Sequence, residues 1–345
     1  MMVEQHKGTH WLVGFAAFIV IIAGLKAASQ IVVPLMLSVF IAIICTPLMS
    51  ALRQRKVPTA LSILLVVLLI LVGVGSLALL VGSTLDDFTR QLPTYKLRFA
   101  EEMSNLIQVL NGLGLQISYD LVKGYVDPSA LMQMMANALR SIGGVLTNLI
   151  LVAMIVIFIL FEAVELPKKL SLALTDASQS MGKFESFMSS VNRYLVIKTL
   201  VSILTGVLIT TWLWILGVDF PILWGVCAFL LNFVPNIGSI IAAVPAVLLA
   251  FVQLGSLSAG LTAAGFVIVN LVVGNVIEPR YMGRGLGLST LVVFLSLLLW
   301  GWVFGPVGML LSIPLTIIVK LALEANPKTH WVAILIDSHA DENKR

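Results

Sequence analysis

The sequence predicts an all-α integral membrane protein, a polytopic helical bundle with two segments broken by proline and glycine. Of its 345 residues, 59% are hydrophobic and only 11% are charged, whereas about a quarter of the residues of a typical soluble domain are charged. Several apolar runs approach or exceed the roughly 20 residues that a helix needs to cross the hydrocarbon core. The alternating pattern of an outer-membrane barrel is absent.

Charge and motifs exclude several function classes. The formal net charge of +4 is small, and the excess of lysine and arginine fits cytoplasmic loops that face anionic lipid, so we expect no nucleic-acid partner. The histidines lie in the polar ends without metal-ligand spacing, and no nucleotide-binding glycine loop follows a strand. Cys45 and Cys227 lie in apolar runs and are interpreted as packing residues. We therefore expect no enzyme activity, catalytic residue, metal or cofactor, and no ATP-driven transport by this chain alone.

The first predicted region covers residues 1–84 and consists of membrane helices. Trp11–Ala28 reads as a retained first span, and Ile31–Leu48 follows so closely that the two predict a tight helical hairpin. The loop at residues 53–56 carries two arginines and a lysine and is expected in the cytoplasm. Counting back across two spans places the N-terminus there too. Ala60–Gly82 is the next span.

Two further regions lead to the second half of the chain. Residues 85–144 carry mixed charges with periodic apolar residues, which predicts a periplasmic insert of amphipathic helices; Asp127 followed by Pro128 is typical of a helix start. We favour the interpretation that this insert is a covering domain without chemistry. Residues 145–193 predict a membrane helix over Val145–Phe161 and then a cytoplasmic interfacial helix.

Residues 194–324 predict the transport core, followed by a cytoplasmic tail at 325–345. Tyr194–Leu216 is a span, and two long apolar stretches after it, Pro221–Val252 and Leu288–Lys320, are each interrupted by proline and glycine. Lipid cannot satisfy the backbone groups that such breaks release, so broken helices are buried in protein or line a wet cavity. Paired interrupted segments are the best sequence pointer to the binding site of a transporter.

Two topologies fit the broken segments. Each is either one kinked span or a re-entrant hairpin that enters and leaves by the same face. Re-entrant hairpins place the charged link between the two stretches in the cytoplasm, where its arginines obey the positive-inside rule, and we favour them. Both schemes leave the C-terminus in the cytoplasm.

Candidate residues of a substrate pathway are the polar or helix-breaking residues at membrane depth, where polar groups are costly. They are Asn232, Pro235, Asn236, Gly238, Asn270, Asn275, Gly305, Pro306 and Gly308. Carbonyls of unwound backbone and asparagine amides suit a polar solute or a cation. The structural alternatives are that the asparagines cap the broken helix or make helix–helix hydrogen bonds.

Glu278, Arg280 and Arg284 in the charged link are the candidates for gating or ion binding. Glu278 and Arg280 flank Pro279 and are expected to form a gating ion pair. In the alternatives, Glu278 carries a proton or sodium ion, or the link is a solvated turn. We favour the pair because no second buried acid lies near in the sequence to complete an ion site.

Four segments carry a family resemblance: residues 234–239, 278–283, 285–289 and 305–315. They resemble the autoinducer-2 (AI-2) exporter family of bacterial inner-membrane proteins, and the resemblance extends over nearly the whole chain. It implies multi-pass transport without ATP hydrolysis in a homo-oligomer, for which we expect a pentamer. It leaves the substrate open, because some relatives resemble sodium/proton antiporters.

Three hypotheses follow. The first is export of AI-2, a small polyhydroxylated quorum-sensing signal whose hydroxyl groups suit carbonyls and asparagine amides. The alternative is a cation/proton antiporter that uses Glu278. The third is a membrane scaffold without transport, which needs no proline- and glycine-broken segments.

Overall fold

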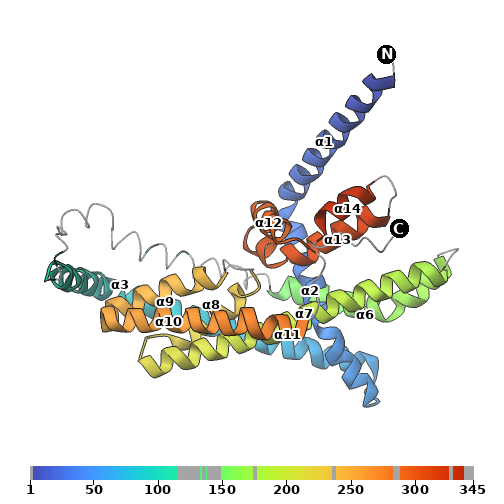
Figure 1. The fold of residues 1–345 in the computed structure, drawn as a ribbon. Coiled ribbons are helices and arrows are strands. Elements are labelled where there is room, and N and C mark those ends of the chain that lie inside the picture. Colours follow the sequence, from blue (N-terminus) through green and yellow to red (C-terminus); the bar gives the residue numbers. More distant parts are fainter. Residues whose placement is uncertain are drawn as a thin grey trace. The chain divides into compact units, whose positions relative to one another are not determined.

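The computed structural model of the chain describes residues 3–112, 114, 133, 137, 149–173, 177–234, 238–282, 288–325 and 329–337. All regular structure in these residues is helical (Figure 1). Five of the helices are long and apolar enough to cross a membrane: Ser29–Gln54, Thr59–Gly112, Val191–Leu216, Ser256–Tyr281 and Thr290–Leu310. The predicted class, an all-α polytopic membrane protein, is confirmed.

The chain forms two compact units. One contains residues 1–42 and 284–345, and the other contains residues 43–283. The boundary between them falls inside helix α2 (Ser29–Gln54). The predicted domain limits, at residues 84, 144, 193 and 324, describe membrane and aqueous regions and stay predictions.

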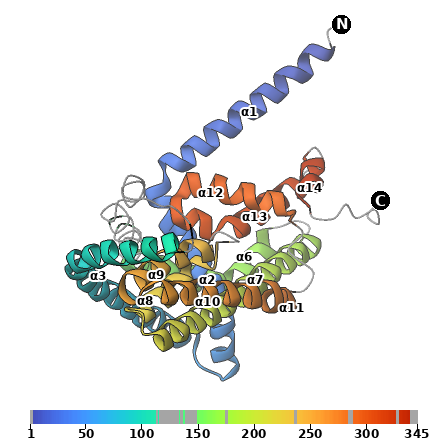
Figure 2. The same cartoon turned by 60° about the vertical axis from the view of Figure 1, so that its left-hand side comes forward.

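The N-terminal helices do not form the predicted hairpin. Ala28 alone separates α1 (Val3–Ala27) from α2, its N–H bonds to the carbonyl of Gly24, and its carbonyl accepts the N–H of Val32. The helical pattern of backbone hydrogen bonds thus resumes within one turn, and the chain bends without reversing (Figure 2). The hairpin prediction is wrong because a reversal needs several non-helical residues. The cytoplasmic N-terminus is inferred by counting two spans back from the basic loop at residues 53–56. Without the hairpin that inference loses its support, and the location of the N-terminus stays a prediction.

The first unit ends in three helices: α12 (Thr290–Leu310), α13 (Ser312–Ala325) and α14 (His330–Ile336). Ile22 of α1 packs with side chains of α12 in a small apolar core. The ammonium of Lys26 lies 3.5 Å from the ring centroid of Trp302, a cation–π contact that holds α1 to α12.

In the second unit, α3 (Thr59–Gly112) is one continuous helix of 54 residues, about 80 Å long. It runs past Gly82, where a span was predicted to end, and buries Phe88, Tyr95 and Phe99 in the core of this unit. The first part of the predicted insert is therefore an arm that packs on the core. Asp127 and Pro128 lie outside the described residues.

The rest of the second unit is one packed bundle of α6 (Leu149–Ala173), α7 (Ala177–Leu216), α8 (Pro221–Leu231), α9 (Gly238–Leu254) and α10 (Ser256–Val272). A π-helical segment, η1 (Val273–Ile277), and α11 (Glu278–Met282) continue α10. Glycine lets α7 and α8 approach closely, because a Cβ on Gly206 would lie only 2.8 Å from the carbonyl oxygen of Gly225. Such small-residue contacts are typical of helix packing in membranes.

Candidate functional site

The first broken segment is an antiparallel hairpin of α8 and α9, called here the first hairpin. Its base is closed where the N–H of Asp219, just before α8, donates to Oε1 of Gln253 at the end of α9, at 2.9 Å. At the tip, Gly238 lies directly against the carbonyl of Leu231, which a Cβ would overlap. The two arms therefore pack together over their length.

The second broken segment, α12 and α13, is also an antiparallel hairpin, called the second hairpin. Gly305 turns the chain with φ 66° and ψ −148°, a conformation that favours glycine. Trp300 Nε1 donates to Thr316 Oγ1 at 3.1 Å across the two arms. Gly308 lies against the carbonyl of Trp300, which a Cβ would overlap.

Both hairpins thus share one steric rule: a glycine past the break packs against a carbonyl of the arm before it. This likeness supports the pairing of the two interrupted segments that the sequence suggests. The arms before the breaks, α8 and Thr290–Phe304, are about 16 and 22 Å long. Both are short of the roughly 30 Å hydrocarbon core. Although α12 as a whole has the length of a span, its turn at Gly305 fits the re-entrant topology better.

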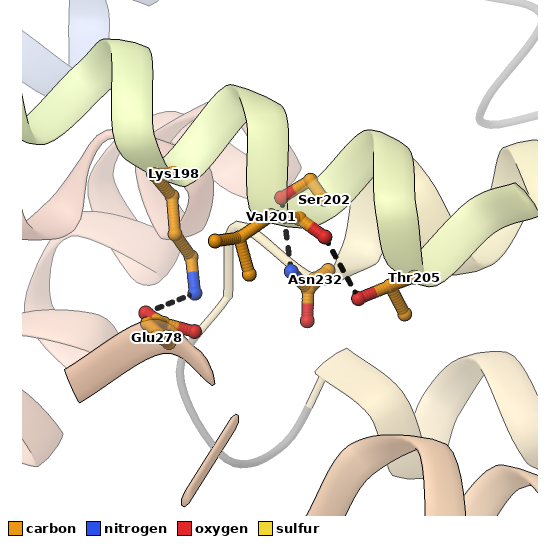
Figure 3. Close-up of polar contacts among 6 residues, drawn as sticks. All are labelled: Lys198, Val201, Ser202, Thr205, Asn232 and Glu278. Atoms are coloured by element: carbon orange, nitrogen blue, oxygen red, sulfur yellow. Dashed lines mark hydrogen bonds and ion pairs between the residues drawn. The ribbon is translucent and has the colours of Figure 1, made fainter. Parts of the chain in front are cut away.

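A polar face on α7 meets the tip of the first hairpin (Figure 3). Lys198, Ser202 and Thr205 follow helical spacing and are buried. Asn232, at the end of α8, donates from Nδ2 to Ser202 Oγ at 2.9 Å. Thr205 Oγ1 donates to the carbonyl of Val201 at 3.0 Å. A break in one helix is thereby tied to a hydroxyl on its neighbour.

One turn along α7, Lys198 forms an ion pair with Glu278 at 2.7 Å between Nζ and Oε1. The two side chains are 6% and 20% exposed. The sequence expectation of a Glu278–Arg280 pair needs correction here, because Lys198 is the partner and Arg280 is exposed. Residues two apart on a helix point to different sides, so α11 directs only one of them toward α7.

The π-helical segment sets the position of Glu278. The N–H of Glu278 bonds to the carbonyl of Val273, five residues earlier, and Pro279 follows at once. Proline has no N–H and its ring crowds the carbonyl of the preceding turn, so a wider turn relieves the crowding. Single π-turns of this kind occur frequently at functional sites.

Within the described part of the chain, the structure does not bring the other candidate residues to this polar face. Pro235, Asn236 and Arg284 lie outside the described residues. Asn270 and Asn275 are exposed. Gly305, Pro306 and Gly308 belong to the second hairpin, in the other unit.

The sequence reasoning missed the polar face of α7. Its signal was present, since Lys198, Ser202 and Thr205 share one helical face within an otherwise apolar run. None of these three residues is among the site residues predicted from the sequence.

Comparison with known proteins gives a consistent picture. The family model described as AI-2E family transporter matches residues 15–328. The chain is 40% identical over 338 residues to the AI-2 transport protein TqsA of Escherichia coli K12, covering 98% of this chain and 97% of that protein. It is 42% identical over 336 residues to a putative transport protein of Haemophilus influenzae, covering 96% and 97% of the two chains. It is 36% identical to the putative transport protein YhhT of Escherichia coli K12, covering 95% and 94%.

Proposed function

The chain belongs to the AI-2E transporter family, and from this premise we propose that it exports AI-2 across the bacterial inner membrane without hydrolysing ATP. The relative named for AI-2 transport is 40% identical to this chain over nearly the whole length of both. The proposed topology puts the basic loop at residues 53–56 and both termini in the cytoplasm, with the chain acting as a homo-oligomer, proposed to be a pentamer.

The observation that carries the proposal is the junction of Asn232 with the polar face of α7. The amide, the hydroxyl of Ser202 and the Lys198–Glu278 pair gather within two turns of one helix. Ionisable and polar groups at membrane depth are costly, face the protein interior and mark substrate pathways. Their place beside a broken helix matches the arrangement by which secondary transporters bind solutes.

The chemistry of this junction suits a small polyol. Asn232 offers both a carbonyl acceptor and amide donors, while Ser202 can donate and accept. Hydroxyl groups of a solute can replace the Asn232–Ser202 hydrogen bond with bonds of the same kind. Breaking that bond to admit the solute therefore costs little free energy. A site built for hydroxyl groups discriminates strongly against analogues that lack them, because its buried polar groups would remain unpaired.

The antiporter alternative receives less support from this geometry. Glu278 is its only candidate acid, and a lysine already neutralises that carboxylate. The pathway role of the other candidates, including Asn270 and Asn275 and the glycines of the second hairpin, stays a prediction.

Flux from proteoliposomes tests the proposal. We expect wild-type protein to release entrapped AI-2 faster than empty liposomes and to show no sodium/proton exchange measured in parallel. Ser202→Ala and Asn232→Leu should slow AI-2 flux. Thr211→Ala is the matched control, because Thr211 is exposed on the same helix and its hydroxyl donates to the carbonyl of Val207 one turn earlier. Equal flux in all variants would remove this junction from the pathway, and exchange without AI-2 flux would favour the antiporter.

A further inference from the structure

We propose that the ammonium group of Lys198 is a built-in counter-ion that fills a cation site at Glu278, so that this site does not bind Na⁺. The inference rests on the proposed transport function only for its consequence, that flux does not depend on Na⁺. Its central claim concerns which cation neutralises Glu278, and that claim is tested without measuring transport.

The surroundings of Glu278 have the elements of a cation site. The carboxylate stands directly after a π-helical segment, with its N–H bonded to the carbonyl of Val273. Because Pro279 cannot donate, one carbonyl in the preceding turn lacks its usual hydrogen-bond donor. Secondary transporters hold coupling cations with backbone carbonyls released at helix irregularities, and an acidic side chain next to such a segment adds the negative charge that a cation needs.

Lys198 occupies the position that such a cation would take. Its Nζ lies 2.7 Å from Oε1 of Glu278, and its side chain is only 6% exposed. The buried side chain of Tyr194, one turn earlier on α7, adds a hydroxyl group but no positive charge. Arg280 is exposed. Among the described residues, one tethered ammonium thus matches the charge of Glu278.

The charge balance of the described residues around Glu278 disfavours a second cation. One carboxylate and one ammonium are already neutral as a pair, and a buried site that also took Na⁺ would carry an uncompensated charge. Removal of Lys198 reverses this situation, because Glu278 would then need either a proton or a small cation.

Melting temperatures of the purified protein in NaCl and in choline chloride, at equal ionic strength, test the inference. Binding of an ion to the folded state alone raises the melting temperature in a concentration-dependent way. We expect wild-type protein and Lys198→Arg to melt at the same temperature in both salts. Lys198→Met should show a saturable upward shift with Na⁺, and the double variant Lys198→Met/Glu278→Gln should lose that shift.

Two controls guard this test. Lys169→Met removes a lysine from an exposed ion pair with Glu162, where both side chains are more than half exposed, and should give no response to Na⁺. Lys198→Gln provides a second neutral variant that still donates a hydrogen bond to Glu278. Stabilisation of wild-type protein by Na⁺ that disappears in Glu278→Gln would overturn the inference. So would folded Lys198→Met and Lys198→Gln without any Na⁺ response, or failure to recover both variants even in NaCl, since an open cation site should be rescued there.

Discussion

Gly238→Ala is the sharpest single test of the first hairpin. Gly238 opens α9 and lies against the carbonyl of Leu231 at the end of α8. A Cβ there would overlap the carbonyl oxygen and come within 2.7 Å of the carbonyl carbon. The obstacle is backbone, which cannot turn aside as a flexible side chain can.

The expected magnitude follows from this geometry. Ordinary van der Waals contact of a Cβ begins at 3.4 Å, so the two arms must separate by at least about 0.7 Å at a packed crossing. Overpacking of this kind costs about 1–3 kcal/mol and occasionally more. Alanine also recovers up to about 1 kcal/mol of helix propensity. The net expectation is a loss of about 2 kcal/mol in the free energy of unfolding, or roughly 30-fold in the folded-to-unfolded ratio.

Gly260→Ala is the matched control for this substitution. Gly260 lies inside α10, and a Cβ there would meet no atom within 4 Å. Its replacement should leave stability unchanged or raise it by up to about 1 kcal/mol. The same chemical change is thus expected to act in opposite directions at two helical positions of one unit.

The assay is thermal unfolding of purified protein in detergent, followed by tryptophan fluorescence at one fixed scan rate because unfolding of such proteins is frequently irreversible. Gly238→Ala should melt below wild-type protein and Gly260→Ala should not. If Gly238→Ala melted at or above the wild-type temperature, α8 and α9 would not pack at this glycine, and the reasoning about the hairpin tip would fail.

Three further predictions concern the ion pair, the topology and the long arm. Lys198→Gln and Glu278→Gln should each cost about 3–5 kcal/mol of stability by leaving a buried charge unpaired, and the double variant should melt above either single one; additive losses would deny the pair. A cysteine at Gln108, on the predicted periplasmic side, should react with an impermeant thiol reagent in intact spheroplasts, and one at Gln54, on the cytoplasmic side, should not. Both positions are exposed and the native cysteines are buried, so labelling reports the side of the membrane; the opposite labelling would invert the topology. The Tyr95 hydroxyl lies 3.0 Å from Oδ2 of Asp219 and 2.8 Å from Oε1 of Gln91. Its single proton is shared between these acceptors, so Tyr95→Phe should lower stability by about 0.5–3 kcal/mol; an unchanged melting temperature would show that the α3 arm is not held there.

The long arm illustrates how far local pattern extends. The apolar run that starts α3 predicts a span, and the change to mixed charge predicts that the span ends near Gly82. The helix continues past Gly82 and through Pro93, and the burial of Phe88, Tyr95 and Phe99 in the core stabilises this continuation. Tyr95 reaches Asp219 across 124 residues of sequence, a contact that no local pattern contains.

The sequence by itself determined the class and the two breaks, because hydropathy over 20 residues and the loss of backbone donors at proline are local properties. It also singled out Glu278 and Asn232 as costly polar residues. Only the tertiary structure decided their partners, Lys198 and Ser202 on α7, since these pairs depend on the rotation and register of packed helices. For the same reason, the bend at Ala28 and the glycine–carbonyl contact that closes each hairpin became visible only in three dimensions.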